Sequence, residues 1–142
     1  MSIEQELEQV RLMGDGVLRP EAVVEYARDE DSALHSRFCW DDTEAARQYR
    51  LWQAREIIHA CVTVYRDDLS PTSIYVSLVA DRRTPGGGYR TLEDVVGDKE
   101  LRTQLLTQAE RDMDRFSTKY SQLVEVAGVI AAMRRVKRVR AA

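Results

Sequence analysis

Apolar residues recur at helical spacing through the first part of the chain, and they predict two short helices. The first covers about residues 3–12, begins after Ser2 as its N-cap and ends at Gly14. The second begins at Pro20, because a proline suits the first position of a helix, and it runs to about Arg28. Each helix should turn a narrow apolar side towards a core.

The next segment predicts a short helix and then a longer one. Ser32 is expected to cap the short helix over residues 33–38, and Asp41 or Asp42 to cap the longer helix, which runs through about His59. A broad apolar face on the longer helix should pack inward. Its members are Ala45, Tyr49, Trp52, Ile57, Ile58 and Cys61.

Beyond this helix, β-branched and aromatic residues replace the helical pattern. They predict strands over residues 61–65 and 74–79, and the turn-rich stretch 67–72 between them favours an antiparallel pair. A third short strand is expected near Tyr89, after a loop over residues 82–88 that contains three consecutive glycines. We expect these glycines to make the loop flexible.

The last third of the chain predicts a long helix that begins after Thr91 or Asp98. Residues 99–135 contain no proline and one glycine, Gly128. A helix of that length, near 50 Å, would extend beyond a domain of this size, so it should either pair with a partner chain or break near Gly128 and fold back. Three heptads of apolar residues favour self-association. This seam comprises Ala109, Met113, Phe116, Tyr120, Leu123, Ala127 and Ile130.

These elements predict an α+β fold in a single domain, which suits a chain of 142 residues. A helical cluster over residues 1–60 would contain a helix-turn-helix-like unit. A β-hairpin region would follow over residues 61–91, then a long helix over 98–135 and a basic tail over 136–142.

Charge is distributed unevenly along the chain. The net charge of −3 comprises −8 for residues 1–46, zero for 47–131 and +5 for 132–142. Overall acidity argues against a protein whose whole surface binds a polyanion, but the oppositely charged ends favour antiparallel or head-to-tail association. No apolar run is long enough for a membrane span and no secretory signal is evident, so we expect a cytoplasmic protein that binds no membrane.

Two pairs of metal-ligating residue types are present, His35 with Cys39 and His59 with Cys61. Neither has the spacing of a zinc knuckle, and the cysteines are better explained as buried thiols. No nucleophile elbow occurs, and Gly86-Gly87-Gly88 lacks the lysine and hydroxyl residue of a phosphate loop. We therefore expect no catalysis, no metal and no cofactor.

Nucleic-acid binding is the leading functional hypothesis. Short helices followed by a hairpin with a glycine-rich tip match the element order of a winged helix-turn-helix protein, which binds duplex DNA. The bulky residues of the candidate recognition helix and the acidic helices before it count against this, and a solvated basic face is the alternative. The expected phosphate contacts are Arg47, Arg50, Arg55, Arg82, Arg83 and Arg90.

Short segments over most of the chain carry a resemblance to known proteins. These segments are Pro20–Glu25, Ser32–His35, Phe38–Asp42, Ala45-Ala46, Tyr49-Arg50, Gln53–Arg55 and Gly88–Arg90. In them the chain resembles a group of small proteins encoded in phage and prophage genomes. The resemblance implies a phage-encoded cytoplasmic accessory protein, but it assigns no functional residue. DNA-binding control is the first expectation. The alternative is an assembly protein that forms a homo-oligomer, or binds a phage protein, through its C-terminal helix.

Overall fold

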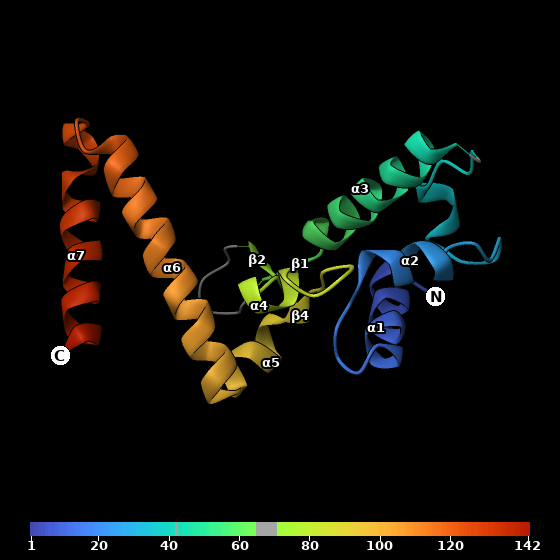
Figure 1. Ribbon diagram of the computed structural model, residues 1–142, viewed down its shortest axis with the longest axis horizontal. Helices are drawn as coiled ribbons and strands as arrows, with labels where there is room; N and C mark the ends of the chain where they lie inside the picture. The colour runs from blue at the N-terminus through green and yellow to red at the C-terminus, as the bar shows by residue number, and fades with distance from the viewer. Residues whose placement is uncertain (42, 65–70) are drawn as a thin grey trace. The chain divides into compact units, whose positions relative to one another are not determined.

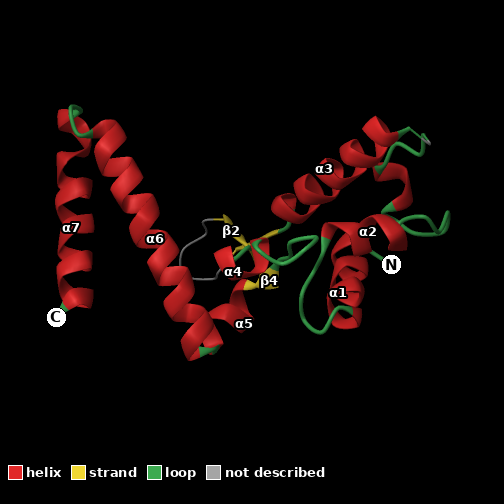
Figure 2. Ribbon diagram, viewed as in Figure 1, coloured by secondary structure: helices red, strands yellow, loops and turns green. Residues whose placement is uncertain are grey.

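A computed structural model describes residues 1–41, 43–64 and 71–142 of the chain. Helices dominate it and the strands are short (Figure 2), so the α+β class is confirmed. The chain divides into two compact units, Met1–Gly97 and Asp98–Ala142, where a single domain was expected. Each unit has its own pattern of packing and charge.

The first two helices form where the sequence predicts them. Helix α1 covers Ile3–Met13, and Ser2 caps it through a reciprocal pair of hydrogen bonds with Gln5. Helix α2 covers Pro20–Tyr26 with the proline at its first position. Both contribute to one hydrophobic core with later elements of the first unit. The buried members of this core are Leu7, Val10, Leu18, Val23, Val24, Ala27, Leu34, Phe38, Ala54, Ile58, Cys61, Tyr75 and Tyr89.

A single 3-10 turn, η1 (His35–Arg37), replaces the short α-helix predicted over residues 33–38. The reason is local hydrogen bonding by Ser32. Its hydroxyl accepts from the backbone amide of Leu34 at 3.1 Å and donates to Glu6 of α1 at 2.7 Å. Serine side chains that bond nearby backbone groups compete with helix formation, and the segment remains a tight turn.

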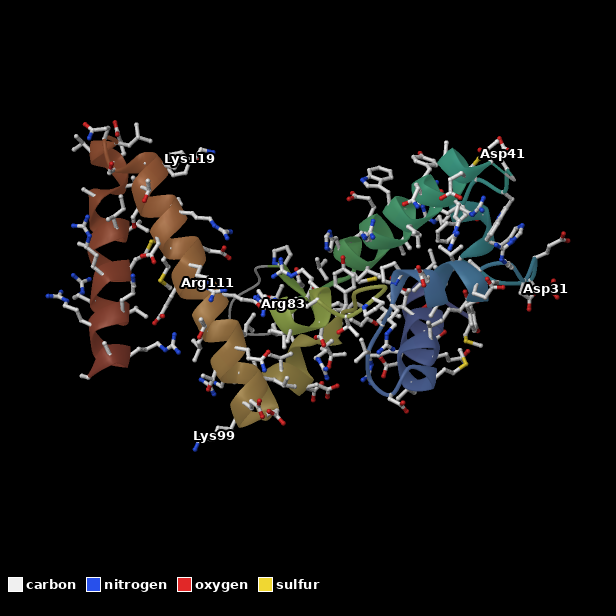
Figure 3. The ribbon with its side chains drawn as sticks, in the orientation of Figure 1. Asp31, Asp41, Arg83, Lys99, Arg111 and Lys119 are labelled. Atoms are coloured by element: carbon white, nitrogen blue, oxygen red, sulfur yellow. The ribbon has the colours of Figure 1, made fainter. Side chains whose placement is uncertain are left out.

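Helix α3 covers Glu44–Ala60, close to the predicted span, but its cap differs from the prediction. Thr43 is the N-cap, and its side-chain oxygen accepts from the amide of Ala46 at 3.1 Å. Asp41 lies ahead of the helix (Figure 3), where its backbone carbonyl accepts from Arg50. The alternative cap, Asp42, lies outside the described residues.

The predicted inward face of α3 is wrong for its two largest members. Tyr49 and Trp52 are 49% and 50% exposed, and Ala45 is also exposed. Arg50 is buried instead, because its guanidinium reaches backbone carbonyl groups and lies over the ring of Trp40. Small alanines on the same side let the helix approach the core closely. The buried side of α3 comprises Ala46, Arg50, Ala54 and Ile58.

Two separate antiparallel pairs form in place of the predicted single pair. Strand β1 (Val62–Val64) pairs with β2 (Pro71–Ser73), which begins inside the predicted connection. Strand β3 (Tyr75–Val76) pairs with β4 (Arg90–Thr91), which confirms a third strand near Tyr89. Helix α4 (Val79–Arg82) takes the end of the second predicted strand. Most of the predicted connection, residues 67–70, lies outside the described residues.

The glycine-rich loop leads directly into a backbone pairing with the segment before α2. Leu18 and Tyr89 exchange backbone hydrogen bonds of 2.7 and 2.8 Å directly after the loop. A side chain at Gly88 would overlap Val17. Gly86 and Gly87 have φ of +84° and +63°, which glycine adopts without strain. The loop follows α4 within the connection between the paired strands β3 and β4.

Two helices follow β4, and both predicted starts are used. Helix α5 covers Leu92–Gly97, where the Thr91 hydroxyl accepts from the amide of Asp94 at 3.1 Å. Helix α6 covers Lys99–Tyr120 and is capped by the side chain of Asp98. Each helix therefore begins at a side chain that satisfies a first-turn amide.

The second unit is a helical hairpin. After α6 the chain turns, passes through the 3-10 turn η2 (Val124–Val126) and continues as α7 (Ala127–Ala141). Helix α7 runs back beside α6 (Figure 1), with Lys137 bonded to Asp114 and Arg140 to Glu110 at 2.7 Å each. The chain thus folds back before Gly128, and the predicted basic tail belongs to α7.

Candidate functional site

A cleft of the first unit has a volume of about 670 Å³. It lies where the start of α2, the last turns of α3, strand β3, helix α4 and the glycine-rich loop meet. Hydrophobic core residues support these elements from beneath. Its lining comprises Pro20, Glu21, Leu51, Arg55, His59, Tyr75, Ser77, Arg82, Thr84, Gly86–Gly88 and Tyr89.

Two of the predicted phosphate contacts, Arg55 and Arg82, meet in this cleft. Both are exposed, and neither guanidinium group forms a hydrogen bond or ion pair with any of the described residues. Burial raises the pKa of the Tyr89 hydroxyl, while the positive charges of Arg55 and Arg82 act in the opposite direction. Both positive charges therefore act on the same hydroxyl, which lines the cleft with them.

Aromatic and hydroxyl groups form the floor of the cleft. Tyr89 is 8% exposed, and the His59 ring meets it edge-on with centroids 5.5 Å apart. Ser77 and Thr84 add hydroxyl groups to the lining, and Glu21 approaches the loop at Gly86. Such a lining suits a group that carries negative charge and accepts several hydrogen bonds, as a phosphate does. Glu21 is the one carboxylate among the described lining residues, and its charge limits how much negative charge a bound group can carry.

The other exposed arginines of the predicted set lie outside this cleft. Arg83 is exposed at the end of α4 (Figure 3), directly after the cleft residue Arg82. Arg47 lines a smaller cleft of about 180 Å³ together with Glu21, Glu25, Arg28 and Arg50.

Two of the predicted phosphate contacts, Arg50 and Arg90, instead form hydrogen bonds within the first unit, so this part of the prediction needs correction. Arg50 is 6% exposed, and its Nη1 donates to the carbonyls of Cys39 at 3.0 Å and Asp41 at 2.6 Å. Arg90 donates two hydrogen bonds to Asp81, at 2.8 and 3.0 Å, and this pair is largely shielded from solvent. Both guanidinium groups stabilise the fold rather than face solvent.

The histidines and cysteines are spread over different parts of the first unit. Among the residues that the structure describes, no three His, Cys, Asp or Glu side chains gather as a metal site would require. His35 bonds the carbonyl of Ala27 through Nδ1 and stacks on Trp40. Cys61 is buried, and burial raises the pKa of its thiol, whereas Cys39 is exposed, so only one of the two thiols is buried as expected.

The predicted oligomerisation seam is divided between the two helices of the hairpin. Ala109, Met113, Phe116 and Tyr120 lie on α6 and are half-buried, and Ile130 on α7 is buried. Leu123 and Ala127, at the turn and the start of α7, are exposed. The seam is therefore not one continuous stripe, and part of it packs within the hairpin.

Two exposed features were absent from the predicted site residues. Tyr49 and Trp52 stack on the outer side of α3, with ring centroids 5.6 Å apart and an interplanar angle of 16°. The second feature is a set of apolar residues at heptad spacing on α7. Its first member, Val129, directly precedes the buried Ile130. This aliphatic stripe comprises Val129, Ala132, Val136 and Val139, and the three valines are 49%, 43% and 75% exposed. Its heptad spacing is visible in the sequence.

No helix in the described ranges is both long and apolar enough to cross a membrane. Comparison with protein-family models, with curated proteins and with solved structures finds no match to this chain.

Proposed function

We propose that this chain is a non-catalytic, phage-type accessory protein that binds nucleic acid through phosphate groups held in the arginine-lined cleft. The observation that carries the proposal is the convergence of Arg55 and Arg82, both without a partner among the described residues, on one hollow of the surface. Guanidinium groups donate forked hydrogen bonds that suit phosphate oxygens. The resemblance to phage-encoded proteins supplies the biological context.

Charge limits the extent of such an interface. The first unit carries eleven arginines and no lysine against eighteen Asp and Glu residues, so most of its surface repels a polyanion. Binding should therefore involve few phosphates. With Arg55 and Arg82 as the contacts, and Arg83 beside them, the slope of log affinity against log salt should be shallow, about −1.8 for two contacts to duplex DNA.

The test is fluorescence anisotropy of a labelled oligonucleotide across a salt series. A double variant, Arg55→Ala with Arg82→Ala, should lose most of the affinity and flatten the salt slope. Arg37→Ala removes an exposed arginine that does not line the cleft, so it is the matched control and should bind normally. No binding by the unmodified chain at low salt, or equal losses in the double variant and the control, would contradict the proposal.

Self-assembly through the second unit is a second candidate function. The aliphatic stripe on α7 favours it, because exposed apolar residues at heptad spacing are typical of a helix that packs on another helix. Lys137 and Arg140 of α7 pair with α6, and the members of the stripe lie between about 100° and 180° around the helix from the buried Ile130. The hairpin thus uses one side of α7 internally and leaves another available to a partner.

A further inference from the structure

The outer side of α3 carries an aromatic pair beside the cleft. Tyr49 and Trp52 are each about half exposed and stack nearly parallel. Arg55 follows Trp52 by three residues, so helical geometry places it on the adjoining part of the same side. The pair is thus next to one of the two arginines on which the proposed function rests.

The exposure of these rings is unlike that of the other Phe, Tyr and Trp side chains that the structure describes in the first unit. Tyr75 and Tyr89 are buried in the core, and Trp40 is half-buried between His35 and Phe38. Leaving Tyr49 and Trp52 in water forgoes the free energy that their burial would contribute. The helix instead buries an arginine and two alanines, so the aromatic pair is available to bind another molecule.

We propose that Tyr49 and Trp52 stack against unpaired bases, so that the nucleic acid bound by this chain is single-stranded. This inference rests on the proposed function, because the phosphates of the same strand would lie on Arg55 and Arg82. Single-strand binding combines a cationic groove that follows the backbone with aromatic rings on which bases stack. In a duplex the base faces are covered by their neighbours, and the two rings would gain no contact with them.

Charge complementarity selects this partner over a protein surface. The side chain next to the rings on the cleft side is the cation Arg55, and the cleft beyond it holds the second cation, Arg82. A phosphate backbone satisfies both guanidinium groups while its bases reach the rings. Few phosphates are needed, which agrees with the acidic character of the first unit.

Anisotropy with two probes tests the inference, a labelled oligothymidylate and a duplex hairpin. Trp52→Ala should weaken oligothymidylate binding about tenfold and leave hairpin binding unchanged, because stacking on one aromatic ring contributes about that much. Trp52→Phe should retain most of the affinity. Leu12→Ala removes an exposed apolar side chain from α1, so it is the matched control and should change neither affinity.

Fluorescence supplies a second measurement. Stacking of a base should quench the emission of Trp52, and the quench should disappear in Trp52→Phe although binding persists, because Trp40 remains as the only emitting indole. A thermal unfolding scan of each variant shows whether the fold is retained, and Trp52 is exposed enough that its loss should leave the midpoint nearly unchanged.

The outcomes separate the inference from the function on which it rests. If both probes bind and require Arg55 and Arg82 but are indifferent to Trp52→Ala, the stacking inference fails and the proposed function stands. If neither probe binds, both fail. If Trp52→Ala lowers the mass measured by light scattering while oligothymidylate affinity is unchanged, the aromatic pair is a protein contact and the inference is overturned.

Discussion

The carboxylate of Glu6 on α1 accepts a hydrogen bond of 2.7 Å from the hydroxyl of Ser32. The same carboxylate accepts from the backbone amides of Ala33 and Leu34 at 3.0 and 3.2 Å. Glu6 is only 4% exposed, so it is a buried charge whose partners are all neutral donors. This cluster joins the first helix to the turn that precedes α3.

Removing the Glu6 carboxylate should therefore destabilise the first unit. Glu6→Ala leaves three donors without their acceptor in a buried place, and we expect a loss of about 2–4 kcal/mol in the free energy of unfolding. Urea denaturation followed by circular dichroism measures it. Glu4→Ala, two residues earlier in α1 and exposed, is the control and should change little. Equal stability of the two variants would mean that the cluster contributes nothing.

The same cluster should make stability depend on acidic pH. Burial acts to raise the pKa of Glu6, but the hydrogen bonds from Ser32, Ala33 and Leu34 together outweigh it and hold the pKa below its ordinary value of 4.5. The stabilisation is then complete above pH 4.5 and is lost as the pH falls through the lower folded-state pKa. Glu6→Gln should show a smaller loss of stability on acidification than the unmodified chain.

Arg50 should behave as a core residue and not as a ligand contact. Arg50→Ala removes two hydrogen bonds to carbonyls and the contact with Trp40, and we expect it to lower the free energy of unfolding by about 2–3 kcal/mol. Arg47→Ala, an exposed position on the same helix, should cost less than about 0.5 kcal/mol. A stable Arg50→Ala protein with impaired nucleic-acid binding would contradict this assignment.

Tyr75 should make the fold sensitive to alkaline pH. Burial, supported by the charge of Glu8, raises its pKa from 10.0 to about 12. The unfolded chain therefore loses this proton first, and the stabilisation that is complete below pH 10 declines as the pH rises towards 12. The urea midpoint should fall across that interval and fall less steeply in Tyr75→Phe. Identical pH profiles would mean that Tyr75 ionises normally.

The convergence of the two cleft arginines has a test that needs no ligand. Arg55→Gln with Arg82→Gln removes both positive charges near Tyr89, so the pKa of its hydroxyl should rise further above its ordinary value. Absorbance titration of the phenolate measures this change, and Tyr89→Phe identifies which transition belongs to Tyr89. An unchanged titration curve would show that the guanidinium groups do not act on this hydroxyl.

Val139 provides a test of the second candidate function. Val139→Asp places a charge on the aliphatic stripe at a position that is 75% exposed, so the hairpin itself should remain folded. If the stripe mediates self-association, light scattering should report a lower mass for this variant. Val124→Asp, also exposed but outside the stripe, is the control and should retain the mass of the unmodified chain. An unmodified chain that is monomeric at high concentration would exclude the stripe as a self-association surface.

Local signals predicted the helix starts well. Ser2, Pro20 and Asp98 each begin a helix as expected, because capping and the fixed φ of proline act within one turn. For α3 the sequence predicts Asp41 or Asp42 as the cap, whereas Thr43 is the N-cap. All three residues suit that position, and only the backbone path selects Thr43. Chain position alone does not distinguish such neighbours.

The orientation of α3 and the composition of the cleft were beyond local reasoning. Hydrophobicity placed Trp52 inside and Arg50 outside, because nothing near Arg50 in the helix reveals the carbonyls that receive it. The sequence predicts six arginines as phosphate contacts, with Arg55 and Arg82 among them, but the common cleft of these two depends on long-range pairing through Tyr89. His59 and Tyr89 were missed as cleft residues for the same reason, since each was explained by its own local segment.

The pairing of Leu18 with Tyr89 has a consequence for the order in which the molecule is completed. Closing a chain between positions so distant is entropically costly and slow compared with forming a single helix. During synthesis the cleft floor cannot form until Tyr89 has left the ribosome, whereas α1, α2 and α3 have left it by then. The α6–α7 hairpin closes across a short turn, so its folding requires no contact between distant residues. The candidate binding cleft should therefore be among the last parts of the first unit to acquire its shape.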